Sequence, residues 1–172
     1  MDDERLMNMA ERESFIATYD AHSDALFRFA FFAVHDRELA KDLVADTFTK
    51  VWEYIAKGNS ADNIRALCYC TLRNLVIDHF RKRKSFSLDA LTEAGFDPAG
   101  DDGRRDVERA EDDRVLKKAI AELPAVFREV VVLRHVEGYT PKEIAEALGI
   151  TQSLVSVRLF RGIALLKQRI RL

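Results

Sequence analysis

The sequence predicts an all-α protein made of two small helical domains joined by an acidic, flexible linker. Apolar residues recur every three or four positions over most of the chain, which is the spacing of one helix face, and no run alternates at period two for long enough to indicate a strand. Near the middle, glycines and acidic residues replace this pattern. We expect an N-terminal tail at 1–13, a first domain at 14–84, the linker at 85–111 and a second domain at 112–172.

Three helices are expected in the first domain, each marked by an apolar stripe. Asp36 can cap the second helix at its N-terminus. The first domain should therefore be a helical bundle. The stripes consist of Phe15, Tyr19, Leu26, Phe29 or Ala30, and Ala33 in the first helix; Leu39, Leu43, Val44, Thr47, Phe48, Val51, Trp52 and Ile55 in the second; and Ile64, Leu67, Cys68, Leu72, Leu75, Val76 and His79 in the third.

Two helices are expected at the start of the second domain. The first is short and ends at Pro124, because proline lacks the amide hydrogen that a helix interior needs. The second ends at Gly138, since glycine commonly follows the last turn of a helix. The residues at helical spacing are Val115, Leu116, Ala119, Ile120 and Leu123 in the first, and Phe127, Val130, Val131, Arg134 and Val136 in the second.

A helix-turn-helix is predicted at the C-terminal end. Thr140-Pro141-Lys142-Glu143 combines a capping threonine, a proline at the first helical position and the capping-box glutamate. Gly149 can end this short helix, and Thr151 can cap a longer one. A two-helix corner in an ordinary bundle is the alternative, with basic residues merely favouring the helix C-terminus. The positions of the final helix expected in the core are Val155, Leu159, Ile163, Leu166 and Ile170.

The net charge of −2 hides strong local differences. Residues 65–84 carry six basic and one acidic side chain, and residues 152–172 carry five basic and no acidic ones. Residues 85–114, by contrast, carry ten acidic and four basic side chains. Because salt screens charges beyond about 8 Å in cells, a DNA phosphate responds to the local block rather than to the total. Two cationic helices are therefore available to nucleic acid, and the acidic segment could mask them in the free protein.

Several other classes of protein are disfavoured. The N-terminus is acidic and no stretch reaches the roughly 20 apolar residues that span a bilayer, so we expect a cytoplasmic protein without membrane insertion. Cys68 and Cys70 would point apart on a helix, which favours reduced thiols and argues against a zinc site with His79. The sequence contains no nucleophile elbow, phosphate-binding glycine-rich loop or His-Glu-x-x-His motif, so neither an enzyme nor a cofactor is expected.

The face of the final helix opposite its apolar stripe is suited to DNA. In helix-turn-helix proteins the start of the second helix enters the major groove, where glutamine and arginine can bond base edges and apolar groups can meet thymine methyls. Basic residues elsewhere on the helix suit phosphates, which fix register without reading sequence. The groove face comprises Gln152, Ser153, Ser156, Val157, Phe160 and Arg161, and the phosphate candidates are Arg158, Lys167, Arg169 and Arg171.

Three segments, taken together and in this order, resemble the extracytoplasmic-function (ECF) class of bacterial sigma factors. The resemblance covers nearly the whole chain. The first segment runs from Asp36 to Phe48 and on through Val51-Trp52, and the second runs from Leu72 to Arg83. The third comprises Leu133-Arg134, Gly138-Tyr139-Thr140 through Ala145, and Val155 to Arg161.

The resemblance implies a non-enzymatic initiation subunit that joins core RNA polymerase. The first domain (region two) would bind the clamp coiled coil of the largest polymerase subunit and capture the melted minus-ten element. The second domain (region four) would read the duplex minus-thirty-five element, and an anti-sigma factor is a further expected partner. The polymerase surface is implied at Asp42, Asp46, Phe48 and Lys50, where carboxylates beside apolar groups suit a basic, partly apolar partner. A solvated helix face would carry the same residues.

The resemblance also implies where each promoter element binds. It places a pocket for a flipped minus-ten base in the loop at 57–63, and the helix that follows interleaves cationic and aromatic residues, which suit single-stranded phosphates and bases. A solvated face with a half-buried tyrosine is the alternative. The minus-ten candidates are Asn59, Ser60, Asn63, Arg65, Tyr69, Arg73, Asn74, Asp78 and Arg81. The minus-thirty-five candidates are Arg134, Thr151, Gln152, Ser153, Ser156, Val157, Arg158, Phe160 and Arg161.

Two other functions remain open from the residues. A stand-alone helix-turn-helix regulator would bind a duplex operator by itself, usually as a dimer. An interaction protein would keep the helices without initiation activity. A sigma factor would instead bind core polymerase tightly and direct initiation.

Overall fold

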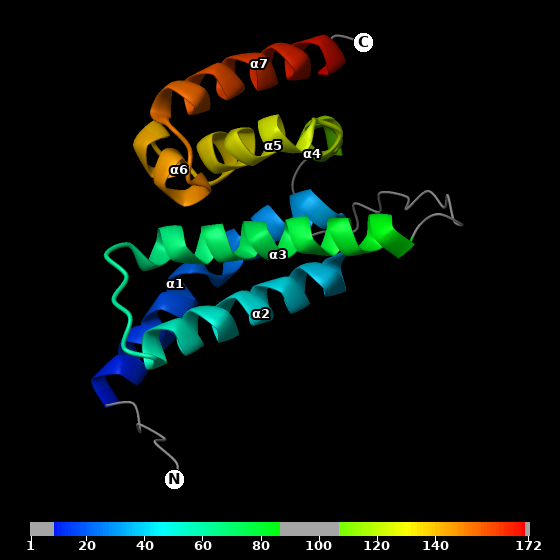
Figure 1. Ribbon diagram of the computed structural model, residues 1–172. Helices are drawn as coiled ribbons and strands as arrows, with labels where there is room; N and C mark the ends of the chain where they lie inside the picture. Colours follow the sequence, from blue (N-terminus) through cyan, green and yellow to red (C-terminus); the bar gives the residue numbers. More distant parts are fainter. Residues whose placement is uncertain (1–8, 87–106, 171–172) are drawn as a thin grey trace.

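The computed structural model describes residues 9–86 and 107–170, and side chains over 12–83 and 113–170 (Figure 1). All regular elements in these ranges are helical, which confirms the predicted all-α fold. In chain order they are α1 (Met9–Val34), α2 (Arg37–Ala56), α3 (Ile64–Phe86), α4 (Val107–Ala121), α5 (Ala125–Val131), the π-helical segment η1 (Val132–Val136), α6 (Pro141–Leu148) and α7 (Gln152–Ile170).

Helices α1, α2 and α3 pack against one another and form the N-terminal bundle (Figure 1). Its core follows the predicted stripes, since Leu26 of α1, Leu43 of α2 and Leu72 of α3 are all buried. Asp36 caps α2 as predicted, because its carboxylate accepts a 3.0 Å hydrogen bond from the Leu39 amide. Helix α3 of the bundle lies between α2 and α6 (Figure 1).

Helices α4 to α7 form the C-terminal group, in which α6 and α7 make the predicted helix-turn-helix. The Thr140 amide donates to the Glu143 carboxylate over 2.8 Å, and the Glu143 amide donates to the Thr140 hydroxyl over 3.3 Å. This is the predicted capping box. Gly149 ends α6 with a φ of 64°, a left-handed conformation that glycine adopts without strain. Thr151 then caps α7 by accepting from the Leu154 amide over 3.2 Å.

A glycine allows α7 to approach α5 closely. A Cβ atom at Gly162 would lie 2.9 Å from Cγ2 of Val131 and 3.4 Å from Cβ of Phe127. Val131 is buried and β-branched, so it has little freedom to move aside. Gly162 therefore sets the distance at which α7 lies on the core of the C-terminal group.

The segment between α5 and α6 differs from the prediction of one regular helix ending at Gly138. The helix changes at Val132 into a five-residue π-helical segment, which the Glu137 amide closes by donating to the Val132 carbonyl over 3.0 Å. Within this segment Arg134 lies exposed, and directly after it the Glu137 side chain turns toward the N-terminal bundle. The spacing of apolar residues in this segment does not predict a π-helical turn.

Two other features of the C-terminal group were not anticipated. Helix α4 begins at Val107, so residues 107–111 of the expected linker are helical, while 87–106 lie outside the described residues. The expectation that Ile170 lies in the core is wrong. Its side chain is 48% exposed, because it belongs to the last turn of α7 at the edge of the group.

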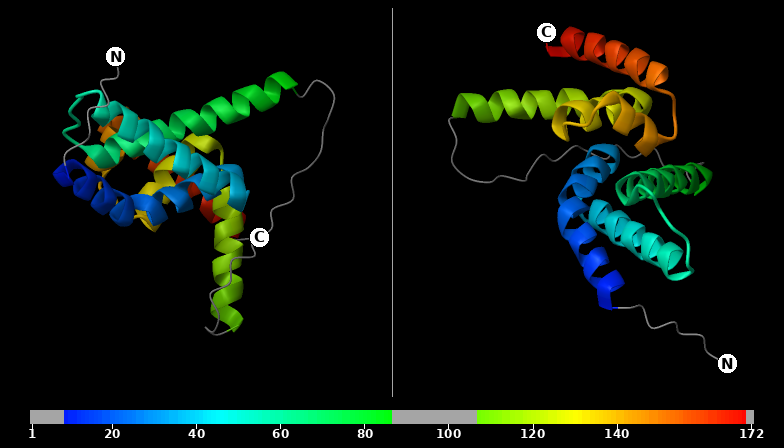
Figure 2. Two further views of the ribbon diagram at one scale, coloured as in Figure 1. Left: turned by 90° about the horizontal axis from the view of Figure 1, so that it is seen from below. Right: turned by 90° about the vertical axis from the view of Figure 1, so that its left-hand side faces the viewer.

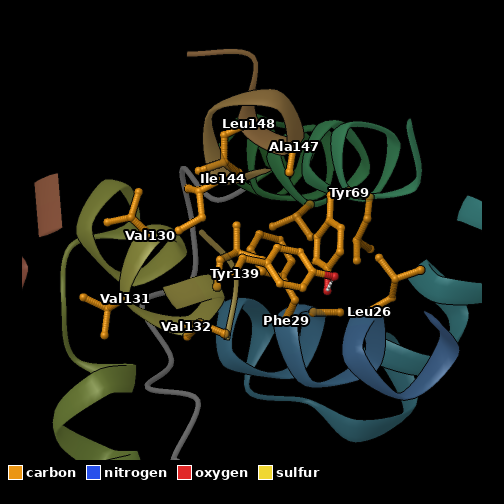
Figure 3. Packing of buried hydrophobic residues seen from close by; sticks show 14 of the residues in the cluster. Leu26, Phe29, Tyr69, Val130, Val131, Val132, Tyr139, Ile144, Ala147 and Leu148 are labelled. Atoms are coloured by element: carbon orange, nitrogen blue, oxygen red, sulfur yellow. Dashed lines mark hydrogen bonds between the residues drawn. The ribbon is translucent and has the colours of Figure 1, made fainter. Parts of the chain in front are cut away.

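The bundle and the C-terminal group share one hydrophobic core. Helix α3 lies against α6, and α1 lies against α5, as Figures 1 and 2 show. Tyr139, from the turn before α6, points into the bundle toward Leu26, Phe29 and Tyr69 (Figure 3). The two groups therefore form one closed unit over the described residues.

No single helix of the described ranges is long and apolar enough to cross a membrane. Helices α6 and α7 reach that length and composition only as a pair, and the pair is bent by 105°.

Candidate nucleic-acid interface

Helix α7 lies on the side of the C-terminal group away from the bundle (Figure 1), and the exposed side chains in its first half form an open face. Phe160 is 79% exposed, an unusual position for a phenylalanine that serves only packing. Val157 beside it is 47% exposed, and Arg161 is exposed as well. This combination offers apolar contacts for thymine methyls and a cation for base edges or phosphates. The predicted groove face is solvent-accessible throughout: Gln152, Ser153, Ser156, Val157, Phe160 and Arg161.

Some of the minus-thirty-five candidates also hold the helix-turn-helix together. The Thr151 hydroxyl caps α7, and the Ser156 hydroxyl donates to the Gln152 carbonyl over 3.1 Å. Arg134 donates from Nη1 to the Tyr139 carbonyl over 2.9 Å, which ties η1 to the turn before α6. Arg158 is half-buried, and its buried Nη1 atom has no hydrogen-bond partner among the described residues. Any of these side chains that contacts DNA would therefore also stabilise the fold.

The N-terminal half of α3, where the minus-ten candidates cluster, is covered by the C-terminal group. Arg65 donates from Nη2 to Glu143 over 2.5 Å, and its guanidinium carbon lies 4.3 Å from the centre of the Tyr139 ring. Arg73 donates from Nε to both carboxylate oxygens of Glu129, at 3.1 and 3.2 Å. Both arginines are therefore paired with acidic side chains of the C-terminal group.

Tyr69 is fully buried, so it cannot contact DNA in this arrangement. Its ring packs edge-on against Phe29 at 5.4 Å and against Tyr139 at 5.5 Å (Figure 3). The Tyr139 hydroxyl donates to the Tyr69 hydroxyl over 3.3 Å. We expected Tyr69 to be either exposed for base stacking or half-buried. It is fully buried instead, because the C-terminal group packs over the side that the bundle leaves open.

The loop before α3 is partly engaged. The Asn63 side chain accepts at Oδ1 from the Ala66 amide over 3.0 Å and donates from Nδ2 to Glu146 of α6 over 3.0 Å. The Asn59 amide donates to the Tyr54 carbonyl over 2.9 Å, and Ser60 is exposed. The side chains of Asn59 and Asn63 thus bond to residues on either side of the loop.

The remaining minus-ten candidates lie farther along α3. Asn74 is exposed. Asp78 and Arg81 pair with each other at 3.1 Å, one turn apart on the helix. Arg81 is exposed and Asp78 is half-buried, so this part of α3 is more open to solvent than the position of Tyr69.

The junction includes a charge pair that the sequence-based candidates omit. Arg28 of α1 donates from Nε and Nη2 to the two carboxylate oxygens of Glu137, each over 2.8 Å. The Glu137 side chain is only 3% exposed, whereas the Arg28 side chain is 47% exposed, so water is kept from the carboxylate and still reaches the guanidinium. The two residues are 109 positions apart, so the sequence around each of them does not predict that they form a pair.

The candidates for a polymerase surface lie on α2, on the side of α3 away from the C-terminal group (Figure 1). Asp42, Asp46 and Lys50 are exposed. Phe48 is 4% exposed and packs against the rings of Phe15 and Tyr19 at 6.0 and 4.7 Å. The expectation that Phe48 lies on this surface therefore needs correction, since its side chain belongs to the bundle core.

Neither cysteine forms part of a binding site in the described ranges. Cys68 is buried and Cys70 is exposed, and both thiols are free. Burial raises the pKa of Cys68 to about 11, which keeps the thiol protonated at neutral pH. Within those same ranges no group of three or more His, Cys, Asp or Glu side chains is placed to hold a metal ion.

Replacing Glu143 by glutamine should destabilise the protein at neutral pH and lose that effect in acid. Hydrogen bonds from the Thr140 amide and the Arg65 guanidinium lower the pKa of Glu143 to about 2 from its ordinary 4.5. The ionised carboxylate thus stabilises the fold above the unfolded-state pKa, and this contribution is lost as the pH falls through about 2. Urea unfolding at a series of pH values should show the gap between wild type and Glu143→Gln closing in this range; a gap independent of pH would contradict the assignment.

Comparison with known proteins identifies two consecutive family regions. Residues 18–86 match Sigma-70 region 2, and residues 113–166 match Sigma-70, region 4. The ECF RNA polymerase sigma factor SigL of Mycobacterium tuberculosis is 28% identical over 159 residues, which cover 92% of this chain and 89% of SigL. The ECF RNA polymerase sigma factor SigX of Bacillus subtilis is 27% identical over 169 residues, covering 93% of this chain and 85% of SigX.

A solved structure resembles the chain across both groups of helices. It is the sigma factor RpoE in complex with the anti-sigma factor NepR from Bartonella quintana, with a TM-score of 0.74 and 25% sequence identity. The match covers 93% of this chain and 98% of that chain.

Proposed function

The chain belongs to the sigma-70 family, and from that membership we propose that it is an initiation subunit that binds core RNA polymerase and directs it to promoters. The observation that carries the proposal is the presence of region 2 and region 4, in that order, on one chain. The open face of α7 and the exposed carboxylates of α2 supply separate surfaces for DNA and for a protein partner. The minus-ten element, the minus-thirty-five element and the polymerase would thus contact different helices.

The chain supplies recognition rather than chemistry in this proposal. Bond formation belongs to core polymerase, and the subunit itself is non-enzymatic and needs no cofactor. A protein that works with bacterial RNA polymerase and DNA works in the cytoplasm. The residues 14–84 would act as region two and 112–172 as region four, with 85–111 connecting them.

Region four reads the minus-thirty-five duplex through α7 in this assignment. Gln152 and Arg161 are placed to bond base edges, and Phe160 is placed to meet thymine methyls, because all three are exposed on the open face. Lys167 and Arg169, farther along the same helix, suit phosphates. Each phosphate contact should steepen the salt dependence of binding by about 0.9 in the logarithmic slope.

Region two holds the melted minus-ten strand along α3 and the loop before it. Arg65 and Arg73 supply cations about two turns apart on one stripe of the helix, and Asn63 supplies an amide just before its start. Strand capture must offset the few kcal/mol needed to unstack a base, which stacking and hydrogen bonds can supply. Asp42, Asp46 and Lys50 on α2 form the proposed polymerase surface.

We also propose that an anti-sigma factor restrains the chain. The RpoE chain in the matched structure is bound to one. A cleft between α1, α3 and α5 offers an apolar surface for such a partner, and Phe32, Val76, Ile77 and Phe80 contribute to its lining. Ile77 and Phe80 are more than 40% exposed there, so a partner that covers them would bury apolar area.

Binding measurements with purified core polymerase test the function. The proposal predicts a stable complex between the full chain and core polymerase, and only weak, salt-sensitive binding of the free chain to duplex promoter DNA. A stand-alone regulator would give the reverse: no complex with core polymerase and tight binding of a duplex operator by itself. That reverse result would overturn the proposal.

Replacing Arg161 by alanine should impair minus-thirty-five-dependent initiation while leaving the affinity for core polymerase unchanged. Loss of a paired contact to a base edge costs about 1–3 kcal/mol, so initiation should fall about 5- to 150-fold. Run-off transcription and an anisotropy titration with core polymerase measure the two effects separately. Equal loss in both assays would show that Arg161 serves folding instead of DNA recognition.

A further inference from the structure

We infer that the cleft between α1, α3 and α5 binds a small amphipathic carboxylate, a molecule with an apolar chain that ends in one carboxylate group. The cleft combines apolar walls with an arginine, Arg128, whose guanidinium uses only one of its three nitrogens in hydrogen bonds with the described residues. Binding of such an acid does not depend on the proposed function. Its consequence for an anti-sigma factor does rest on that proposal.

The walls of the cleft are apolar from its inner part to its opening. Phe29 and Val132 line it and are buried. Ile77 and Phe80 of α3 also line it, and they are 44% and 41% exposed. An apolar chain that lies along the cleft would remove these two side chains from water, and the apolar area buried in this way favours binding.

Arg128 offers an unused pair of donors at this cleft. Its Nη1 atom donates to the Ala121 carbonyl over 2.7 Å and to the Leu123 carbonyl over 3.4 Å, which caps the end of α4. Its Nε and Nη2 atoms donate to no group among the described residues. Arg28 uses these same two nitrogens to bind both oxygens of Glu137. A ligand carboxylate could bind Arg128 in the same bidentate way.

The charge of Arg128 also calls for an anion. The other charged residues that line the cleft are Arg73 and Glu129, and they pair with each other at 3.1 and 3.2 Å. Burial lowers the pKa of Arg128 more than the charge of Glu129 raises it. Burial, and then the charge of Arg128, lower the pKa of His35, so this neighbour is neutral at pH 7. The cleft therefore carries one uncompensated positive charge, which a carboxylate would balance.

The two features together define the class of ligand. An inorganic anion would pair with Arg128 and leave the apolar walls in water. An uncharged apolar molecule would cover the walls and leave the two donors of Arg128 without an acceptor. A chain with a terminal carboxylate satisfies both. Because it would cover Ile77 and Phe80, the bound acid would compete with the anti-sigma factor proposed for this cleft.

The experiment titrates octanoate, octanol and acetate into the full chain without polymerase. Methyl NMR signals of Val76 and Val132, which line the cleft, report binding there. We expect octanoate to give saturable shifts and octanol to bind at least about tenfold more weakly, because it lacks the charge-assisted pair of hydrogen bonds. Acetate should give no shifts at the same concentrations. Absence of octanoate binding, or equal binding by octanol or acetate, would overturn the inference.

Two substitutions of Ile77 test the charge of the site without altering Arg128. Ile77→Glu and Ile77→Lys remove the same apolar side chain from a position that is 44% exposed, so both variants should fold. Octanoate should bind about tenfold more weakly to Ile77→Glu than to Ile77→Lys, whereas octanol should not distinguish them. Equal octanoate affinities of the two variants would contradict the inference.

Arg128→Lys tests the donor itself. Lysine keeps the charge but cannot present two parallel donors to a carboxylate. Octanoate should therefore bind about tenfold more weakly, with octanol unaffected, and an unchanged octanoate affinity would show that Arg128 is not the partner. Circular dichroism checks the helical content of this variant, since Arg128 also caps α4, and the Ile77 pair provides the test if that content falls. Polymerase takes no part in these titrations, so their failure is distinguishable from failure of the proposed function.

Discussion

Tyr69→Ala is expected to lower the free energy of unfolding by about 3–5 kcal/mol, the cost of truncating a large buried aromatic side chain. Tyr69 is fully buried, and its ring contacts Phe29 within the bundle and Tyr139 from region four. Truncation would leave a cavity where the two groups meet. Because a single domain's stability is only about 5–15 kcal/mol, the loss should be evident in urea unfolding and as a lower Tm.

Tyr69→Phe is the matched control for this prediction. It keeps the ring and removes only a hydroxyl that accepts one 3.3 Å hydrogen bond from Tyr139. Its cost should be about 1 kcal/mol. If Tyr69 served only to stack on a base, Tyr69→Ala would keep wild-type stability and lose only promoter melting. That pattern would contradict the packing role described above.

Asp42→Lys combined with Asp46→Lys is expected to weaken binding to core polymerase about 100-fold, because like charges placed across an interface cost several kcal/mol. Both carboxylates are exposed on α2, away from the junction, so the free energy of unfolding should change by no more than about 0.5 kcal/mol. A fluorescence titration with core polymerase measures the affinity, and urea unfolding measures the stability.

Reversal of two exposed carboxylates, one on α4 and one directly after it, provides the control for charge. Asp113→Lys with Glu122→Lys changes the net charge by the same amount at a surface for which no polymerase contact is proposed. Its affinity for core polymerase should stay near that of wild type. Equal weakening by both pairs would show that the polymerase responds to overall charge, and the surface on α2 would then be assigned wrongly.

Features that depend on neighbouring residues were predictable from the sequence. The Asp36 cap, the Thr140–Glu143 capping box and the glycine at 149 each act within one turn of helix, so the residue types alone indicate them. The apolar period likewise predicted the buried stripes of the bundle. It failed at five positions whose side chains are 39% to 48% exposed, because spacing along a helix does not tell where the covering elements end: Tyr19, Val115, Leu116, Val136 and Ile170.

Features that depend on the docking of distant segments were not predictable in the same way. The pairing of Arg28 with Glu137, and the burial of Tyr69 by Tyr139, join residues at least 70 positions apart. Their side chains look like an ordinary exposed cation and an ordinary helix aromatic until the two groups are placed together. The π-helical segment that directs Glu137 inward has no local sequence pattern either.

Phe48 shows how the two kinds of sequence reasoning can disagree. Its position in the apolar stripe of the second helix predicted a core residue, whereas the family resemblance implied a polymerase contact. The structure buries it against Phe15 and Tyr19, so the stripe was the better guide. The polymerase surface on α2 stays a prediction, and it now rests on the exposed carboxylates near Phe48.

Transcription from a promoter library by core polymerase, with and without the chain, tests the central claim most directly. The 5′ ends of the transcripts identify the start sites and the sequences upstream of them. If the chain is a promoter-directing sigma factor, start sites should appear only when it is added, and they should share both a minus-ten and a minus-thirty-five element. Absence of chain-dependent start sites, with a stable duplex complex formed by the chain alone, would contradict the account.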